Sequence, residues 1–126
     1  MGTPPDVAEL VERAYRTWNE HGPRAFVEYT TEDFELHDAP ELPDPEVWVG
    51  REAAVARFEE VVAATRGRWA DVDEVRPIGD EVLVSLTWRI ERDGAPLACV
   101  YHRVLVEGDR IARVRVFLDQ DAAAAG

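Results

Sequence analysis

The sequence predicts an α+β fold in which about three N-terminal helices pack on one strongly bent, mainly antiparallel sheet and enclose a pocket. Three observations predict it. Apolar residues recur at helical spacing up to about residue 67. From there the apolar period changes to two, which is typical of strands. Tight-turn sequences separate these later segments, so helices are segregated from strands, as in α+β folds.

The first helix is predicted from Asp6 onward. Asp6 and Glu9 have the spacing of a capping box, and Gly22 is placed to end the helix. Pro23 suits the first turn of a second, short helix. The apolar stripe of the first helix consists of Val7, Leu10, Val11, Ala14, Tyr15 and Trp18.

The segment DFELHD, residues 33–38, alternates apolar and polar residues and is the first predicted strand. A loop rich in proline and acidic residues follows over residues 39–47, and its prolines should stiffen it. Gly50 opens the third predicted helix, which ends at Gly67. The apolar face of that helix consists of Val55, Phe58, Val61 and Val62.

Four long strands are predicted after the third helix. Their sequences are RWADVDEVRPIG, EVLVSLTWRIER, PLACVYHRVLVE and RIARVRVFLD. Between them lie turns at residues 79–80, 93–94 and 107–109, of which Asp93-Gly94 is the strongest hairpin signal. The terminal DAAAAG is predicted as a frayed helical turn. Without a repeat or a linker, residues 1–126 are expected to form a single domain.

Composition excludes several classes of function. The chain has 126 residues, and its 26 acidic against 14 basic residues give a net charge of −12. Such a surface repels nucleic acid and anionic membranes. No apolar run is long enough to span a membrane and the N-terminus does not resemble a signal peptide, so a cytoplasmic protein is expected. Cys99 is the only cysteine, no metal-ligand spacing occurs, and no cofactor is expected. The high Ala, Arg and Val content suggests a bacterial source.

The order of these segments resembles the SnoaL-like branch of the nuclear transport factor 2-like superfamily. The motifs ELHDAPELP, VGREAAVARFEE and GDRIARVRVFLD carry the resemblance, which extends from Asp6 to Asp119. It implies a cone-shaped fold with an internal pocket. The superfamily includes isomerases, polyketide cyclases, epoxide hydrolases, dehydratases, binding modules and noncatalytic subunits, so the fold does not choose among these functions.

Asp38 is the first candidate catalytic residue. It shares its strand parity with Phe34 and Leu36, which directs it toward the core. A carboxylate beside apolar walls is suited to proton transfer. The resemblance places Asp38 where ketosteroid isomerase carries its general base. The alternative is a strand-end residue that caps the turn at residues 39–40.

Tyr15 and His102 are the other candidate catalytic residues. Tyr15 lies on the buried stripe of the first helix, and the resemblance places it near the oxyanion-stabilising tyrosine of the isomerase. The alternative is a core tyrosine bonded to a backbone carbonyl. His102 lies among inward valines and needs a hydrogen-bond partner, which would be Asp38 or a ligand; a satisfied core histidine is the alternative.

The predicted ligand is a small apolar molecule in the cone. The predicted pocket wall consists of Trp18, Phe34, Leu36, Trp48, Phe58, Trp88, Val100 and Val116. The chain departs from its enzymatic relatives at two positions. Val116 stands where the cyclases have their last-strand acid, and Tyr101 aligns near the second oxyanion acid of the isomerase.

Three functions therefore stay open. The first is an isomerase, cyclase or dehydratase acting on a small apolar or polycyclic carbonyl compound with Asp38 as base. The second is a non-catalytic ligand-binding protein, which the missing last-strand acid favours. The third is a protein-interaction module. A homodimer through the outer sheet face is also expected, because apolar residues share the outward parity. These residues are Leu83, Leu97, Tyr101, Leu105 and Phe117.

Overall fold

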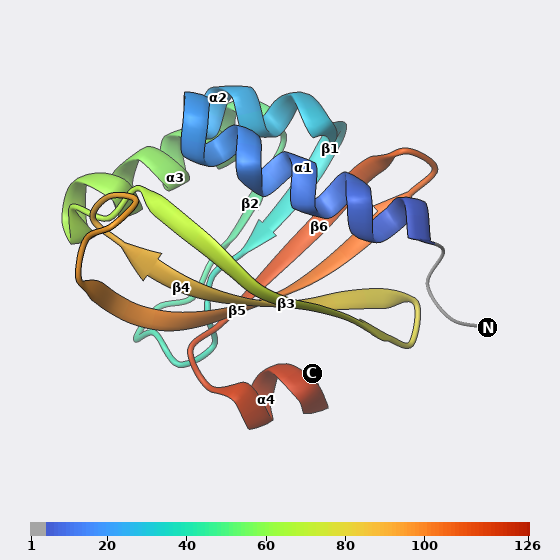
Figure 1. Cartoon of the computed structure of the whole chain (residues 1–126). Coiled ribbons are helices and arrows are strands. Elements are labelled where there is room, and N and C mark those ends of the chain that lie inside the picture. Colours follow the sequence, from blue (N-terminus) through green and yellow to red (C-terminus); the bar gives the residue numbers. More distant parts are fainter. Residues whose placement is uncertain (1–4) are drawn as a thin grey trace.

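A computed structural model describes residues 5–126 and shows helices on a curved sheet (Figure 1). The N-terminal half contains five elements besides one 3-10 turn at Val27–Tyr29. They are α1 (Pro5–His21), α2 (Pro23–Phe26), β1 (Thr30–His37), β2 (Val47–Val49) and α3 (Arg51–Thr65). The C-terminal half contains β3 (Trp69–Ile78), β4 (Glu81–Arg89), β5 (Pro96–Glu107), β6 (Arg110–Phe117) and α4 (Gln120–Ala125). The predicted α+β class is confirmed.

The six strands form one sheet in the order β2-β1-β6-β5-β4-β3. Within residues 5–126, β1 and β6 pair in parallel, while the other neighbouring pairs are antiparallel. The sheet is therefore mainly antiparallel, as predicted. The long meander β3 to β6 returns the chain beside its first strand, so residues near both ends of the sequence face the same interior.

Helices α1, α2 and α3 cover one face of the sheet, and α4 lies against the opposite face (Figure 1). We call these the inner and the outer face. The inner face and the three helices share one apolar core because their apolar periods match their secondary structure. Its fully buried large side chains include Val11, Phe26, Phe34, Val55, Val82, Val84, Val104, Ile111 and Val114.

Three local expectations are corrected. The structure has a fourth helix, α4, where the sequence predicted a frayed turn. It also has an unpredicted short edge strand, β2, which begins at residue 47, the last residue of the predicted loop. Asp6 lies in the first turn of α1 and not before it, because the helix already includes Pro5. The residues that precede this helix are outside the described part of the chain.

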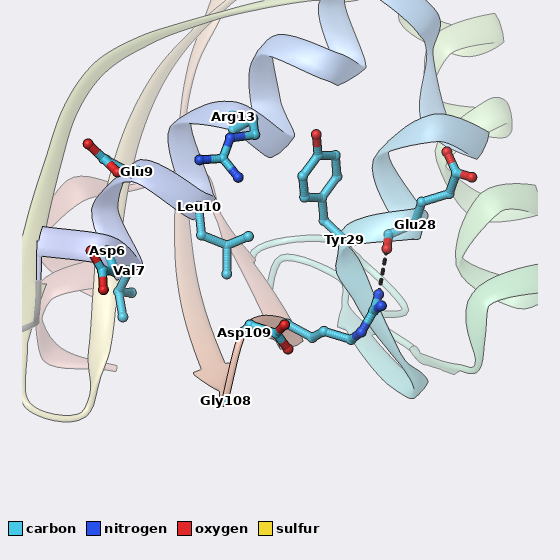
Figure 2. A pocket seen from close by; sticks show the side chains of 10 residues that line it. Asp6, Val7, Glu9, Leu10, Arg13, Glu28, Tyr29, Gly108 and Asp109 are labelled. Carbon is cyan, nitrogen blue, oxygen red and sulfur yellow. Dashed lines mark hydrogen bonds between the residues drawn. The ribbon is translucent and has the colours of Figure 1, made fainter.

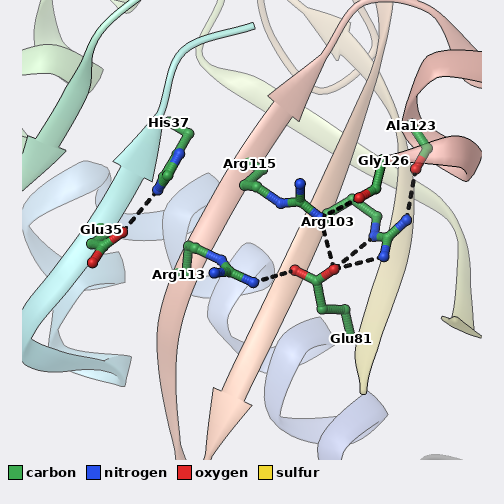
Figure 3. A network of polar contacts seen from close by, with 8 residues as sticks. All are labelled: Glu35, His37, Glu81, Arg103, Arg113, Arg115, Ala123 and Gly126. Carbon is green, nitrogen blue, oxygen red and sulfur yellow. Dashed lines mark hydrogen bonds and ion pairs between the residues drawn. The ribbon is translucent and has the colours of Figure 1, made fainter. Parts of the chain in front are cut away.

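A charged cluster lies on the outer face (Figure 3). The carboxylate of Glu81 accepts hydrogen bonds from Arg103 at 2.6 Å, Arg113 at 3.0 Å and Arg115 at 2.9 Å. Glu81 is only 3% exposed. Arg103 also donates to the carbonyl of Ala123, which ties α4 to the sheet. We call Glu81 and the three arginines the outer cluster.

Helix α4 covers two residues that were predicted to lie in a dimer interface. Leu83 and Phe117 are buried against Ala123 within one chain. The prediction of an open apolar face is therefore wrong for these two positions. Leu97 is exposed, as predicted, whereas Tyr101 and Leu105 are half-buried.

No helix in residues 5–126 is long and apolar enough to cross a membrane. The single-domain organisation, the bacterial source and the cytoplasmic location stay predictions.

Candidate functional site

The inner face becomes less buried toward one end of the sheet. On β4 the inward residues are buried up to Leu86, and Trp88 is half-buried. On β5 Val104 is buried, His102 is half-buried and Ala98 is exposed. Trp88 pairs with Ala98, so both strands lose burial in the same direction. This wide end is lined by half-buried residues: Trp48, Phe58, Val62, Trp88, Val100, His102 and Val116.

A polar pair lies inside this mainly apolar interior. The hydroxyl oxygen of Tyr15 and Nδ1 of His102 are 2.6 Å apart. Tyr15 comes from α1 and is buried, while His102 comes from β5, so the helix and the sheet meet through this contact. The Tyr15 ring also packs edge-on against Phe26, with ring centroids 5.4 Å apart. The two side chains face one another because each lies on the apolar side of its own element.

Both members of the pair are neutral near pH 7. Burial raises the pKa of Tyr15 far above its ordinary value and lowers the pKa of His102 to about 4. The shared hydrogen bond has two proton arrangements. If Tyr15 donates to Nδ1, the His102 Nε2–H remains; if Nδ1–H donates to Tyr15, the tyrosine O–H remains. Either arrangement leaves one neutral donor for another acceptor.

Asp38 follows β1 directly, and its side chain is 9% exposed. Its Oδ1 accepts from Arg57 Nε at 3.0 Å and from Trp48 Nε1 at 3.4 Å. Its Oδ2 accepts from the Glu46 amide at 3.1 Å, and its own amide donates to the Glu46 carbonyl at 2.9 Å. Asp38 therefore closes the proline-rich loop and attaches it to α3. The loop that Asp38 closes extends to Glu46, whereas the alternative drawn from the sequence was a cap of the turn at residues 39–40.

The strand register relates Asp38 to the polar pair. In the parallel pair, His37 of β1 lies opposite Arg115 of β6. Continued by one residue, this register puts Asp38 level with Val116, which itself pairs with His102. Two strand spacings separate the backbones of Asp38 and His102, or about 10 Å. The structure pairs His102 with Tyr15 and Asp38 with Arg57, so it does not join Asp38 and His102 directly.

Aromatic rings pack against one another from Tyr15 of the polar pair to Trp88 at the wide end. Trp18 packs edge-on against Phe58 at 5.0 Å and Phe26 at 5.9 Å, and lies 5.9 Å from Trp88 at a tilt. The Trp18 indole is fixed by a 2.9 Å hydrogen bond to the Arg68 carbonyl. Among the predicted wall residues, the buried ones are Trp18, Phe34 and Leu36. Those half-buried at the wide end are Trp48, Phe58, Trp88, Val100 and Val116.

Sequence reasoning missed two contributors. Arg57, which also lies 5.7 Å from the Trp48 ring, holds Asp38 in place. In the sequence, Arg57 is marked by nothing except its place next to the apolar residue Phe58. Charged residues next to apolar ones are common on surface helices, so this position does not indicate a role. Phe26 is the second, because its contact with both Tyr15 and Trp18 depends on how α2 packs against α1.

Two clefts lie elsewhere on the molecule. The larger, of about 560 Å³, lies between the start of α1, the 3-10 turn and the β5–β6 turn (Figure 2). Leu10 and Tyr29 form part of its wall, and Arg110 beside it donates to the Glu28 carbonyl at 2.7 Å. The smaller, of about 210 Å³, lies between α1 and β3. Neither cleft is lined by a residue of the predicted site.

Residues 5–126 contain no group of three or more His, Cys, Asp or Glu side chains placed to hold a metal ion. The candidate site consists of three parts: the neutral pair, the aromatic rings around it and the Asp38–Arg57 ion pair.

Comparison with known proteins shows the family and the fold of the chain. The family model of the SnoaL-like domain matches residues 11–114, which is most of the chain. The chain belongs to the SnoaL-like domain family. No curated protein sequence matches it.

Solved structures show the same fold at low identity. Bal32a, from a soil-derived mobile gene cassette, is 22% identical with a TM-score of 0.74 over 94% of this chain and 92% of Bal32a. An NTF2-like protein of unknown function from Mesorhizobium loti is 21% identical, with a TM-score of 0.69 over 90% and 91% of the two chains. TerC, co-crystallised with polyporic acid, is 17% identical, with a TM-score of 0.71 over 94% and 95%.

Proposed function

We propose that this SnoaL-like protein binds a small apolar molecule with a carbonyl or phenolic oxygen at the wide end. The Tyr15–His102 pair donates a hydrogen bond to that oxygen. The observation that carries the proposal is the 2.6 Å contact within a neutral pair that keeps one donor unused. In apolar surroundings, a neutral donor favours a neutral acceptor because a charged ligand would lose its hydration.

The walls of the wide end support the same ligand class. Ligand sites are mainly apolar with a few placed polar groups, and aromatic rings line this end of the sheet. The neighbour TerC was co-crystallised with polyporic acid, which makes that compound a reasonable second ligand to test. Because an acid is charged near neutral pH, it should bind more weakly than a neutral compound.

Binding is tested by titrating the protein with Nile red, a neutral planar dye with one carbonyl group, and with polyporic acid. We expect saturable one-to-one binding, followed by dye or tryptophan fluorescence. Tyr15→Phe removes the hydrogen bond that orders the pair and, in one of the two proton arrangements, the free donor itself. It should weaken the affinity about tenfold, the equivalent of one hydrogen bond of ~1.4 kcal/mol.

The matched control is Tyr29→Phe. It removes a hydroxyl that accepts from Thr17 at 3.2 Å beside the larger cleft and outside the wide end. Equal affinities of the two variants would contradict the role of the pair. Failure of the wild-type protein to bind Nile red would overturn the proposed function.

A catalytic function is the second candidate. It is supported by the β1–β6 register, which, if continued by one residue, brings Asp38 level with Val116, the partner of His102. In this proposal Asp38 removes a proton from a carbon beside the ligand carbonyl. The C–H electron pair then forms an enolate, whose oxygen accepts a hydrogen bond from the Tyr15–His102 pair. Return of the proton to another carbon completes an isomerisation without a cofactor.

Asp38→Asn tests the catalytic role. It should lower the turnover of a converted ketone by about 10²–10⁴, the usual contribution of a general base. Because Asp38 also bonds Arg57, loss of stability must be separated from loss of chemistry. Arg57→Gln removes the same ion pair and keeps the carboxylate. If both variants melt alike and lose activity alike, Asp38 serves only to close the loop.

We also propose a homodimer through the part of the outer face that α4 leaves free. Val47 and Val49 on the edge strand β2 are 51% and 60% exposed, and Leu97 is exposed as well. Light scattering should report twice the mass of one chain at high micromolar concentration. A monomer under these conditions would exclude this interface.

A further inference from the structure

The indole of Trp88 is one of the half-buried side chains of the wide end and lies directly on Gly67. A Cβ atom built on Gly67 would be 2.2 Å from Trp88 Nε1 and 2.7 Å from its Cε2, so no other residue fits under the ring in this position. Gly67 does not have the positive φ seen at four other described glycines. Its lack of a side chain is therefore needed for close approach and not for its backbone conformation.

One hydrogen bond holds the Trp88 ring over Gly67. Its Nε1 donates to Thr65 Oγ1 at 3.1 Å. The same Oγ1 accepts from the Gly67 amide at 3.1 Å and donates to the Val61 carbonyl at 2.8 Å, so the end of α3 positions it. The Trp88–Thr65 bond lies at the surface, where water replaces it readily.

The ring beneath Trp88 is held much more firmly. Trp18 is buried, its indole donates to the Arg68 carbonyl, and Phe26 and Phe58 pack against it. Ring contacts continue inward from Trp18 through Phe26 to Tyr15 and end at His102. Trp88, a half-buried ring held by one exposed hydrogen bond, therefore packs against the firmly held ring of Trp18. The shortest series of ring contacts from Trp88 to the polar pair passes through Trp18.

We propose that Trp88 is the gate of the wide end: a planar ligand enters when the indole leaves Gly67, and takes its place against Trp18. The inference rests on the proposed ligand binding at this end. It adds a route by which the ligand enters. It also adds a requirement on the ligand, which must have a flat apolar face that replaces the indole. The indole returns to Thr65 and Gly67 when the ligand leaves.

Two substitutions open the gate without touching the polar pair. Gly67→Ala puts a methyl group where the ring now lies and displaces it. Thr65→Val keeps the shape of the side chain and removes the acceptor of the indole. Thr87→Val is the matched control, because the Thr87 hydroxyl donates to Asp73 at 2.6 Å on the exposed outer face.

Stopped-flow mixing with Nile red measures the association rate. If the closed gate leaves about 10% of molecules open, Gly67→Ala should raise the association rate about tenfold and Thr65→Val by a smaller factor. Thr87→Val should leave the rate unchanged. Equal rates in all four proteins, each with a normal circular dichroism spectrum, would overturn the gate and leave the proposed ligand binding intact.

A second measurement needs no ligand. The indole N–H of Trp88 should exchange with solvent faster in Thr65→Val than in the wild-type protein, as followed by nuclear magnetic resonance. Its resonance should shift in Gly67→Ala. An indole signal that neither substitution changes would overturn the gate even if no dye binds, whereas absence of dye binding alongside these changes would count against the proposed function only.

Discussion

On the inner face of the sheet the polar pair is neutral, whereas the outer face of the same strands buries full charges. His102 and Arg103 are neighbours in β5 and point to opposite faces. His102 meets the hydroxyl of Tyr15, and Arg103 meets the carboxylate of Glu81. Two successive residues therefore lie in environments that favour opposite charge states.

The hydrogen-bond partner of each buried group, and not burial alone, decides whether that group is charged or neutral. Burial opposes the charge of Glu81, but hydrogen bonds from Arg113, Arg115 and Arg103 outweigh it and lower the pKa of the Glu81 carboxyl. Burial lowers the pKa of His102 to about 4 because a neutral tyrosine offers no compensating charge. The outer cluster is thus a fixed structural element, while the inner pair keeps a neutral donor that a ligand can use.

The largest effect should follow from removing the carboxylate of the outer cluster. Glu81→Gln leaves three arginines around a neutral amide, and breaking a buried ion pair in this way costs about 3–5 kcal/mol of stability. Urea denaturation measures the loss. Glu74→Gln is the control, since Glu74 lies 3.9 Å from Arg76 at the surface and should matter by less than about 1 kcal/mol. A small loss in Glu81→Gln would mean that the cluster is not a buried charged unit.

A smaller loss of stability should follow from lowering the pH. The pKa of His102 is about 4 in the folded chain and 6.5 unfolded, so the unfolded chain binds a proton first as the pH falls. The stability due to neutral His102 is complete above pH 6.5 and is lost down to about pH 4, in total ~3 kcal/mol. Glu81, whose folded pKa is lowered, loses its contribution only below its unfolded value of 4.5.

Denaturation between pH 7 and 5 therefore isolates the histidine. The free energy of unfolding should decrease over this range in the wild-type protein and much less in His102→Gln. Because His21 and His37 are present in both proteins, their contributions cancel in the comparison. An identical slope in the two proteins would show that the inner pair is not kept neutral by burial.

The inner and outer faces also differ in how well the sequence predicts the elements that cover them. Periodicity identified α1 and the four long strands, because each buries one continuous face such as Val82, Val84 and Leu86. Helix α4 has no apolar stripe, since Ala122 and Ala123 make its contact with Leu83 and Phe117. Its position depends on Arg103, which is distant in sequence. The strand β2 has three residues, too few for a period to appear.

For the candidate site, parity predicted the face of each residue but not its partner. It assigned Tyr15 and His102 to the interior, yet the 2.6 Å contact between them depends on how α1 crosses the sheet. It also directed Asp38 inward without revealing Arg57, which comes from a helix that packs on the same face. Distances between elements depend on tertiary packing, which no single strand or helix encodes.

The smallest effect should come from the cap of α4, the second feature that occupies the outer face. Asp119 Oδ2 accepts from the Ala122 amide at 2.9 Å and caps the helix. Asp119→Ala should destabilise α4 by about 1 kcal/mol, as is usual for a lost N-cap. Hydrogen exchange of the Gly126 amide, which bonds the Ala122 carbonyl, should accelerate about fivefold. Asp121→Ala, in the first turn but without the cap bond, is the control and should change exchange less. If both variants exchange alike, α4 is held by Arg103 and its apolar contacts, and the outer face would then depend on its charges alone.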